Sequence, residues 1–314
     1  TKLKKETSYT YKVRCTNGSG LTKEASGTGS TLGMTNPSIK QKSETPGGYS
    51  YATSRVVQIT YSGTNISSPV YYFKTSVGAT VPSGVVTGVC GTSTNPGNCS
   101  TSNVTTLVAN TWYRTSSTTP SITYSANGTL YALTSDGTNV SGTSTYTVTK
   151  IDTSAPNVSM SVGGIKTDRA VITAACSDTE SGITKYEYSK DNGTSWINNG
   201  TTGSYTFTKL NKETSYTYKV RCTNGSGLTK EVGSTNNTLG ISNPSIKQTS
   251  ETPGGYSYAT SRVVQITYSG TNISSPVYYF KTSVGATVSS GVVTGVCGTS
   301  TNPGNCSTSN VTTL

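Results

Sequence analysis

The carboxylates of the segment SDTESGI are the first side chains that could do chemistry. Asp178 and Glu180 could act as the carboxylate pair of a glycosidase, or supply oxygen ligands to calcium. They lie only two residues apart in a Gly-containing turn, so neither retaining nor inverting glycosidase geometry follows from the spacing. Calcium favours clustered acids such as D-x-D-x-D, which the sequence lacks. We therefore expect these side chains to cap a turn.

The absence of histidine narrows the chemistry further. None occurs in the 314 residues, which removes Ser-His and Cys-His nucleophiles, histidine metal sites and the commonest general base. Zinc would be a competing use of the cysteines, but the sequence contains no C-x-x-C spacing. We therefore expect no catalytic residue, no metal and no cofactor, and a protein that is not an enzyme.

The segment SKDNGTSW at residues 189–196 matches the pattern S-x-D-x-G-x-[ST]-W. It resembles the Asp-box of sialidases and other β-propellers. This resemblance implies a hairpin turn in which Asp191 accepts backbone hydrogen bonds, Gly193 has a positive φ and Trp196 packs beneath. A propeller would repeat the box about once per blade of roughly 40–50 residues. The motif occurs once here, so we expect a structural turn without sialidase activity.

A long internal repeat organises the chain. Residues 1–107 recur as residues 208–314 without a gap, with only ten differences, and five of these fall at residues 25–30. The period of 207 is too long for a solenoid unit and suits a pair of domains of about 100 residues each. The chain begins and ends inside such units, so we expect a fragment of a longer array.

The positions of the seven cysteines follow the repeat, since three of them recur 207 residues later. Cys90 and Cys99 bracket a polar turn, which Cys297 and Cys306 reproduce in the second copy. Cys176 and Cys222 would close a loop of about 46 residues, which the chain-entropy model values at roughly 4 kcal/mol. Cys15 corresponds to Cys222, so we expect it to be unpaired only because its partner precedes this fragment. Disulfides place the protein outside a reducing cytosol.

Strand-like segments rich in Thr, Val and Tyr, separated by Asn-Gly, Asp-Gly and Pro-Gly turns, predict an all-β fold without helices. In KLNKETSYTYKVRCTN, Tyr216 follows Leu210 by six residues and precedes alternating Tyr218 and Val220. This run resembles the E to F corner of fibronectin type III and related sandwiches. The resemblance implies a buried Leu210 and a Tyr216 hydroxyl that bonds to the backbone upstream.

The order Cys176, Trp196, Cys222 also resembles the inter-sheet disulfide and core tryptophan of immunoglobulin domains. Residues 126–156 resemble the last strands and exit linker of bacterial Ig-like surface repeats. Together these features predict tandem Ig-like and fibronectin III-like sandwiches in an extended array. We expect an Ig-like domain at 37–150, a fibronectin III-like or Ig-like domain at 153–238, and truncated domains at 1–33 and 244–314.

Charge and composition bear on partners. The formal net charge is +11, but Lys and Arg are scattered singly, so we expect no nucleic-acid binding. No apolar run is long enough for a transmembrane segment. The sequence therefore favours a stalk, fibre shaft or adhesin of a bacterial surface or secreted protein. Alternatives are a multivalent module that binds a host glycan or surface protein, lateral self-association into fibres, and an accessory region of a secreted hydrolase.

Overall fold

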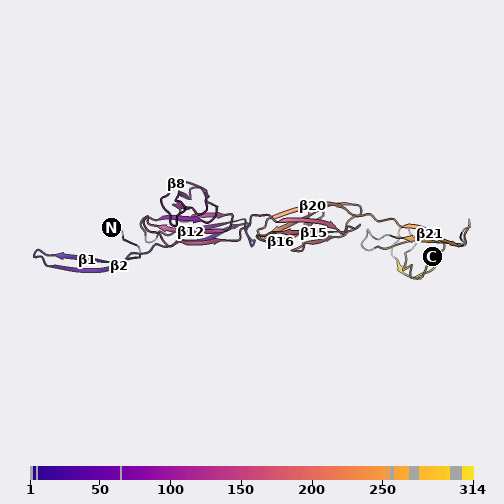
Figure 1. The fold of residues 1–314 in the computed structure, drawn as a ribbon. Coiled ribbons are helices and arrows are strands. Elements are labelled where there is room, and N and C mark those ends of the chain that lie inside the picture. Colours follow the sequence, from indigo (N-terminus) through magenta and orange to yellow (C-terminus); the bar gives the residue numbers. More distant parts are fainter. Residues whose placement is uncertain are drawn as a thin grey trace.

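The computed structural model describes residues 3–4, 6–63, 66–252, 254, 258–268, 276–297 and 306–314. The described residues form β-strands, turns and bends, without a helix. The fold class predicted from the sequence is therefore confirmed. Two sandwiches follow one another along an elongated chain, and smaller sheets lie at either end (Figure 1).

The first sandwich, here called the longer sandwich, spans residues 38–148 and consists of two antiparallel sheets. One sheet has six strands, in the order β13 (Ser144–Val148), β12 (Gly128–Ser135), β5 (Val70–Thr75), β10 (Trp112–Thr115), β7 (Val86–Val89) and β8 (Ser100–Thr101). The other has five, in the order β3 (Ser38–Thr45), β4 (Ser54–Thr60), β11 (Ser121–Tyr124), β6 (Ala79–Thr80) and β9 (Thr106–Leu107).

The second sandwich, here called the shorter sandwich, spans residues 157–237. Its three-stranded sheet has the order β14 (Asn157–Gly163), β15 (Ala170–Ser177) and β18 (Ser204–Phe207). Its four-stranded sheet has the order β17 (Ile197–Asn198), β16 (Ile183–Ser189), β19 (Ser215–Asn224) and β20 (Thr229–Asn237). This division of seven strands into three and four is the arrangement of a fibronectin III-like sandwich.

Alternation along β19 explains how the shorter sandwich forms its core. Successive side chains of a strand point to opposite faces, so Tyr218, Val220 and Cys222 face inward and are at most 1% exposed. The intervening Lys219 and Arg221 lie on the outer face and pair with glutamates there. Thr and Tyr suit such a half-buried pleated surface, which is why a chain with few aliphatic residues still builds a core.

A tyrosine corner joins the two sheets of the shorter sandwich. Leu210 is buried, and the backbone N–H of Asn211 donates to the Tyr216 hydroxyl at 2.9 Å. The longer sandwich contains the same device, because Leu107 is buried and the N–H of Val108 donates to the Tyr113 hydroxyl at 2.6 Å. In both corners the residue three positions after the leucine has a positive φ. The angle is 50° at Glu213 and 61° at Asn110. Only the first of the two corners is predicted from the sequence above, although both have the same spacing.

In the part of the chain that the structure describes, three hairpins lie outside the two sandwiches, and each is the repeat counterpart of a hairpin inside one of them. They are β1 (Ser8–Thr16) with β2 (Thr22–Ser30), β21 (Ser245–Thr252) with β22 (Ser261–Thr267), and β23 (Gly295–Val296) with β24 (Ser307–Thr308). The register of β1 with β2 is that of β19 with β20 shifted by the repeat period. Tyr11 and Val13 are 54% and 63% exposed, whereas their counterparts Tyr218 and Val220 are buried by the opposing sheet.

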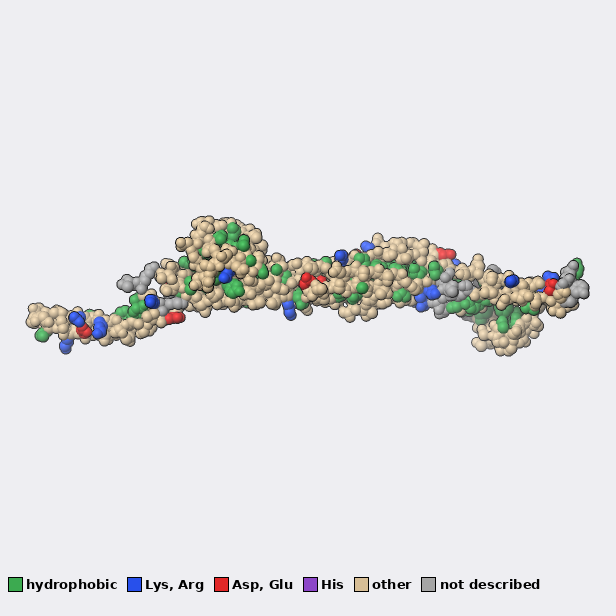
Figure 2. Space-filling view, viewed as in Figure 1, with side chains coloured by type: hydrophobic (Ala, Val, Ile, Leu, Met, Phe, Trp, Pro, Cys, Tyr) green, Lys and Arg blue, Asp and Glu red, His purple; other side chains and the backbone are tan. Residues whose placement is uncertain are grey.

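A small lobe stands out from the side of the longer sandwich. It consists of residues 90–101, which include β8, and is here called the β8 lobe (Figure 1). Its loop covers Trp112, whose indole N–H donates to the Ser93 carbonyl at 3.0 Å. Residues 90–101 contain no charged side chain, and the space-filling view shows hydrophobic side chains among the other atoms of the lobe surface (Figure 2). The described residues contain no helix long and apolar enough to cross a membrane.

Candidate functional site at the joint between the sandwiches

The segment between β13 and β14 is held by backbone pairing to the longer sandwich. The Ala52 N–H donates to the Lys150 carbonyl at 3.0 Å, and the Asp152 N–H donates to the Ala52 carbonyl at 2.9 Å. Ile151 is buried within the core of the longer sandwich. These contacts orient the linker, so that the Asp152 side chain enters the shorter sandwich from a position that the longer one determines.

Asp152 is 2% exposed and is surrounded by donors from the shorter sandwich. Its Oδ2 accepts from the Asn224 Nδ2 at 2.9 Å and from the Ser181 hydroxyl. Its Oδ1 accepts from the Ser154 N–H at 2.8 Å. A buried carboxylate is costly unless its oxygens are hydrogen-bonded, and here both oxygens are.

Asn224 is the centre of this polar cluster and is fully buried. Its Nδ2 also donates to the Asp178 Oδ2 at 3.0 Å and to the Ser154 carbonyl at 2.8 Å. Its Oδ1 accepts from the Leu228 N–H at 2.9 Å and from both the N–H and hydroxyl of Ser226. A flipped amide would set its oxygen against the Asp152, Asp178 and Ser154 acceptors. Its NH2 would then face the N–H groups of Ser226 and Leu228, so the network determines its orientation.

The loops of the two sandwiches also meet directly. The Tyr51 N–H donates to the Gly225 carbonyl at 3.1 Å. The Tyr49 ring lies over Gly227, where an added Cβ would come within 2.7 Å of the ring. Gly227 has a φ of +82°, so glycine is required there both by conformation and by space. We call the contacts of residues 49–52, 150–154, 178–182 and 224–227 the joint.

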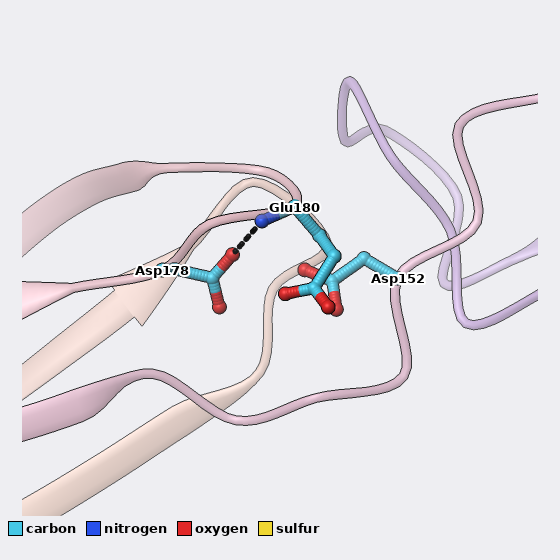
Figure 3. A group of neighbouring side chains, drawn as sticks. All are labelled: Asp152, Asp178 and Glu180. Carbon is cyan, nitrogen blue, oxygen red and sulfur yellow. Dashed lines mark hydrogen bonds between the residues drawn. The ribbon is translucent and has the colours of Figure 1, made fainter.

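Asp152, Asp178 and Glu180 form a group of acids at the joint (Figure 3). Each offers a carboxylate oxygen, and these oxygens lie within 4.8 Å of one another. The sequence predicted the turn at Asp178, whose Oδ1 accepts from the N–H groups of Glu180 and Ser181. It did not predict Asp152, which lies in the segment before β14 and is brought to Asn224 by the fold. The Asn224 Nδ2 donates to both Asp152 and Asp178, and so lies between two of the three carboxylates.

The Asp191 turn is built as its motif implies. Asp191 Oδ1 accepts from the Ser195 N–H at 2.9 Å and from the Ser189 hydroxyl at 2.6 Å. Gly193 has a φ of +87°, and Trp196 packs against it. The expected core position of Trp196 is wrong, because the ring is half-buried on the outer face of the sheet. The guanidinium of Arg221 lies 4.3 Å from the ring centroid.

The structure joins cysteines in three disulfides, Cys90 with Cys99, Cys176 with Cys222, and Cys297 with Cys306. The second connects β15 to β19, and therefore links the two sheets of the shorter sandwich. Cys15 is free and exposed. In the longer sandwich, residues 49–52 contribute to the joint, while residues 91–99 lie in the β8 lobe.

Hydrogen bonds lower the pKa of three carboxyl groups in the shorter sandwich. The hydroxyls of Ser189 and Ser195 lower the pKa of Asp191 to about 2. Arg221 lowers the pKa of Glu187 against the opposing effect of burial. Burial acts to raise the pKa of Asp178, but donors from Asn224, Ser181 and Glu180 together bring it below its ordinary value.

The shorter sandwich is therefore expected to lose stability in acid. A carboxyl whose pKa is lower in the folded state stabilises the fold above its unfolded pKa of about 4, and this contribution is lost as pH falls through the folded value. Urea unfolding between pH 5 and pH 2, followed by Trp196 emission in a Trp112→Phe background, should show a falling midpoint. Asp191→Asn should flatten the lower part of the curve. Equal midpoints at both pH values would contradict the expectation.

Several solved structures of multidomain proteins are similar to parts of this chain. A stretch of titin domains is 19% identical, with a TM-score of 0.35, and the match covers 74% of this chain and 75% of that one. A two-domain fibronectin type III segment of chicken tenascin is 10% identical, with a TM-score of 0.27, over 64% of this chain and 98% of that one. Fibronectin(III)-like modules of Clostridium thermocellum CbhA are 13% identical, with a TM-score of 0.27, over 64% and 94%.

No protein-family model and no curated protein sequence matches the chain. The assignment of the fold therefore rests on the strand order, the register and the tyrosine corners. On that evidence the chain is an array of tandem Ig-like and fibronectin III-like β-sandwiches.

Proposed function

We propose that this chain is a structural repeat region of a bacterial extracellular surface protein, acting as a stalk, fibre shaft or adhesin. The observation that carries the proposal is the joint, which connects consecutive sandwiches end to end through buried, fully hydrogen-bonded side chains. A short linker held by both neighbours limits the angles between domains. Near-identical copies of the unit, joined in this way, would lengthen the array without adding a new binding or catalytic site.

The disulfides support an extracellular location, because such bonds persist in oxidising compartments. The proposal includes a domain pair as the repeat unit, with boundaries near residues 37–150 and 153–238. It also holds that the array is not an enzyme. The most polar buried cluster in the described residues is engaged in holding two domains together, which is a structural task.

Pulling single molecules of the full chain tests this function. Under oxidising conditions the Cys176 to Cys222 bond keeps its 46-residue loop closed, so unfolding of the shorter sandwich should release about 160 Å less chain than after reduction. Small-angle scattering should give an elongated particle. A compact particle, or unfolding forces indistinguishable from those of an unstructured chain, would contradict a load-bearing spacer.

A second candidate function is multivalent binding through the β8 lobe. Between Lys74 and Arg114 the sequence has no charged residue, and the lobe stands clear of the rest of the longer sandwich (Figure 2). An uncharged, disulfide-clipped surface suits a neutral glycan or protein partner, and repetition would add avidity. A glycan array probed with the full chain tests this, with Cys90→Ala/Cys99→Ala as the variant that releases the lobe.

A further inference from the structure

The Cys176 to Cys222 disulfide and the joint are built on the same two strand ends. Cys176 lies near the end of β15 and Asp178 follows it by two residues. Cys222 lies near the end of β19 and Asn224 follows it by two residues. The disulfide and the bond from Asn224 Nδ2 to Asp178 Oδ2 are therefore two successive crosslinks between the same segments.

The crosslinked segments continue directly into the loops that hold the longer sandwich. The turn after Asp178 supplies Ser181, whose hydroxyl donates to Asp152. The loop after Asn224 supplies Gly225, which accepts from Tyr51 and donates to the Gly182 carbonyl. The separation of β15 from β19 thus determines whether the Asp152 carboxylate can reach Ser181 and Asn224 together.

The disulfide lies beside a groove that opens to solvent. Cys222 is fully buried, but Cys176 is half-buried and lines an open groove of about 280 Å³ with Val158, Ala175 and Lys230. Lys230 lies opposite Cys222 in the β19 and β20 register. The rate of thiol–disulfide exchange depends on which sulfur is attacked and on access to it, and the groove offers such access beside Cys176.

We propose that the Cys176 to Cys222 disulfide is a redox control on the stiffness of the joint. A dithiol reductant attacks the Cys176 sulfur and forms a mixed disulfide, and Cys222 leaves as a thiolate that takes up a proton. The second thiol of the reductant then displaces Cys176, so the reductant ends as a cyclic disulfide and the protein holds two thiols. Without this crosslink the strand ends separate more easily, and the polar cluster no longer holds the two sandwiches at one angle. The inference concerns the joint itself, and holds whatever the array does.

The test measures the angle between the sandwiches in the full chain. Spin labels attached through non-natural amino acids at the exposed Ser116 and Lys212 report the distance between the far ends of the two sandwiches. Dithiothreitol, or the Cys176→Ala/Cys222→Ala variant, should broaden the distance distribution about twofold or more. Cys90→Ala/Cys99→Ala, without reductant, should leave it unchanged. An equally narrow distribution in the Cys176→Ala/Cys222→Ala variant would overturn the proposal.

Hydrogen exchange separates loosening of the joint from general destabilisation. The amides of Tyr51 and Gly225 are bonded at the joint, whereas the Leu210 amide donates to the Asp168 carbonyl at the far end. Removal of the disulfide should speed exchange at the joint amides about tenfold more than at Leu210. Equal acceleration at all three amides would show that the disulfide acts on the whole sandwich, and would reject a specific control on the joint.

Discussion

Replacing Asn224 by aspartate should lower the free energy of unfolding of the shorter sandwich by about 3 kcal/mol at pH 7. The new side chain keeps an acceptor for Ser226 and Leu228, but turns a carboxylate oxygen toward Asp152 and Asp178 in place of the Nδ2 donor. Three carboxylates would then share a buried cluster. Denaturant unfolding followed by Trp196 emission measures the loss.

The repeat provides a matched control for this substitution. Asn17 occupies the equivalent position, and its Oδ1 accepts from the N–H groups of Ser19 and Leu21 as Asn224 does from their counterparts. It is exposed and has no carboxylate neighbour among its described contacts. Asn17→Asp should therefore change stability by less than about 0.5 kcal/mol. Equal effects of the two substitutions would show that the carboxylates of the joint do not matter.

The Asn224→Asp effect should also depend on pH. Repulsion among three carboxylates in the variant should raise the pKa of one of them. Its protonation as pH falls restores a donor to the cluster, so part of the lost stability should return. The distance distribution across the joint should broaden in the same variant at pH 7. A variant that is destabilised but keeps a narrow distribution would show that the cluster stabilises the sandwich without orienting its neighbour.

Replacing Tyr218 by alanine should destabilise the shorter sandwich by about 4 kcal/mol. The side chain is 1% exposed and packs against Phe207 and Tyr216, with ring centroids 5.7 Å and 6.0 Å away. Truncation removes this packing and leaves a cavity between the sheets. Thermal or urea unfolding of the shorter sandwich, again followed by Trp196, gives the change.

Tyr11 provides the control, since the same residue in the same local sequence is 54% exposed. Tyr11→Ala should leave the unfolding of the shorter sandwich unchanged. Because the two hairpins share their register, any difference between the variants comes from the opposing sheet and not from strand propensity. A similar loss in both variants would contradict the packing of Tyr218 at the centre of the core.

Local pattern predicted most strands because alternation and turn residues act over a few neighbours. In the shorter sandwich, β15 shows this alternation clearly, because every second residue from Ala170 to Ala174 is buried. Strands of two residues, such as β6 and β8, show no period of their own and are defined by their pairing with neighbouring strands. The corner at Leu107 and Tyr113 could have been found, since it has the six-residue spacing of Leu210 and Tyr216.

The sequence by itself determined the repeat, the all-β class and the turn chemistry of Asp191, because each depends on residues close together or on direct comparison of copies. Only the tertiary structure decided the outer position of Trp196 and the joint. Asp152 lies 72 residues from Asn224, and they meet because the longer sandwich holds the linker while the disulfide-linked strand ends present the amide. Long-range packing sets that distance, and no local pattern encodes it.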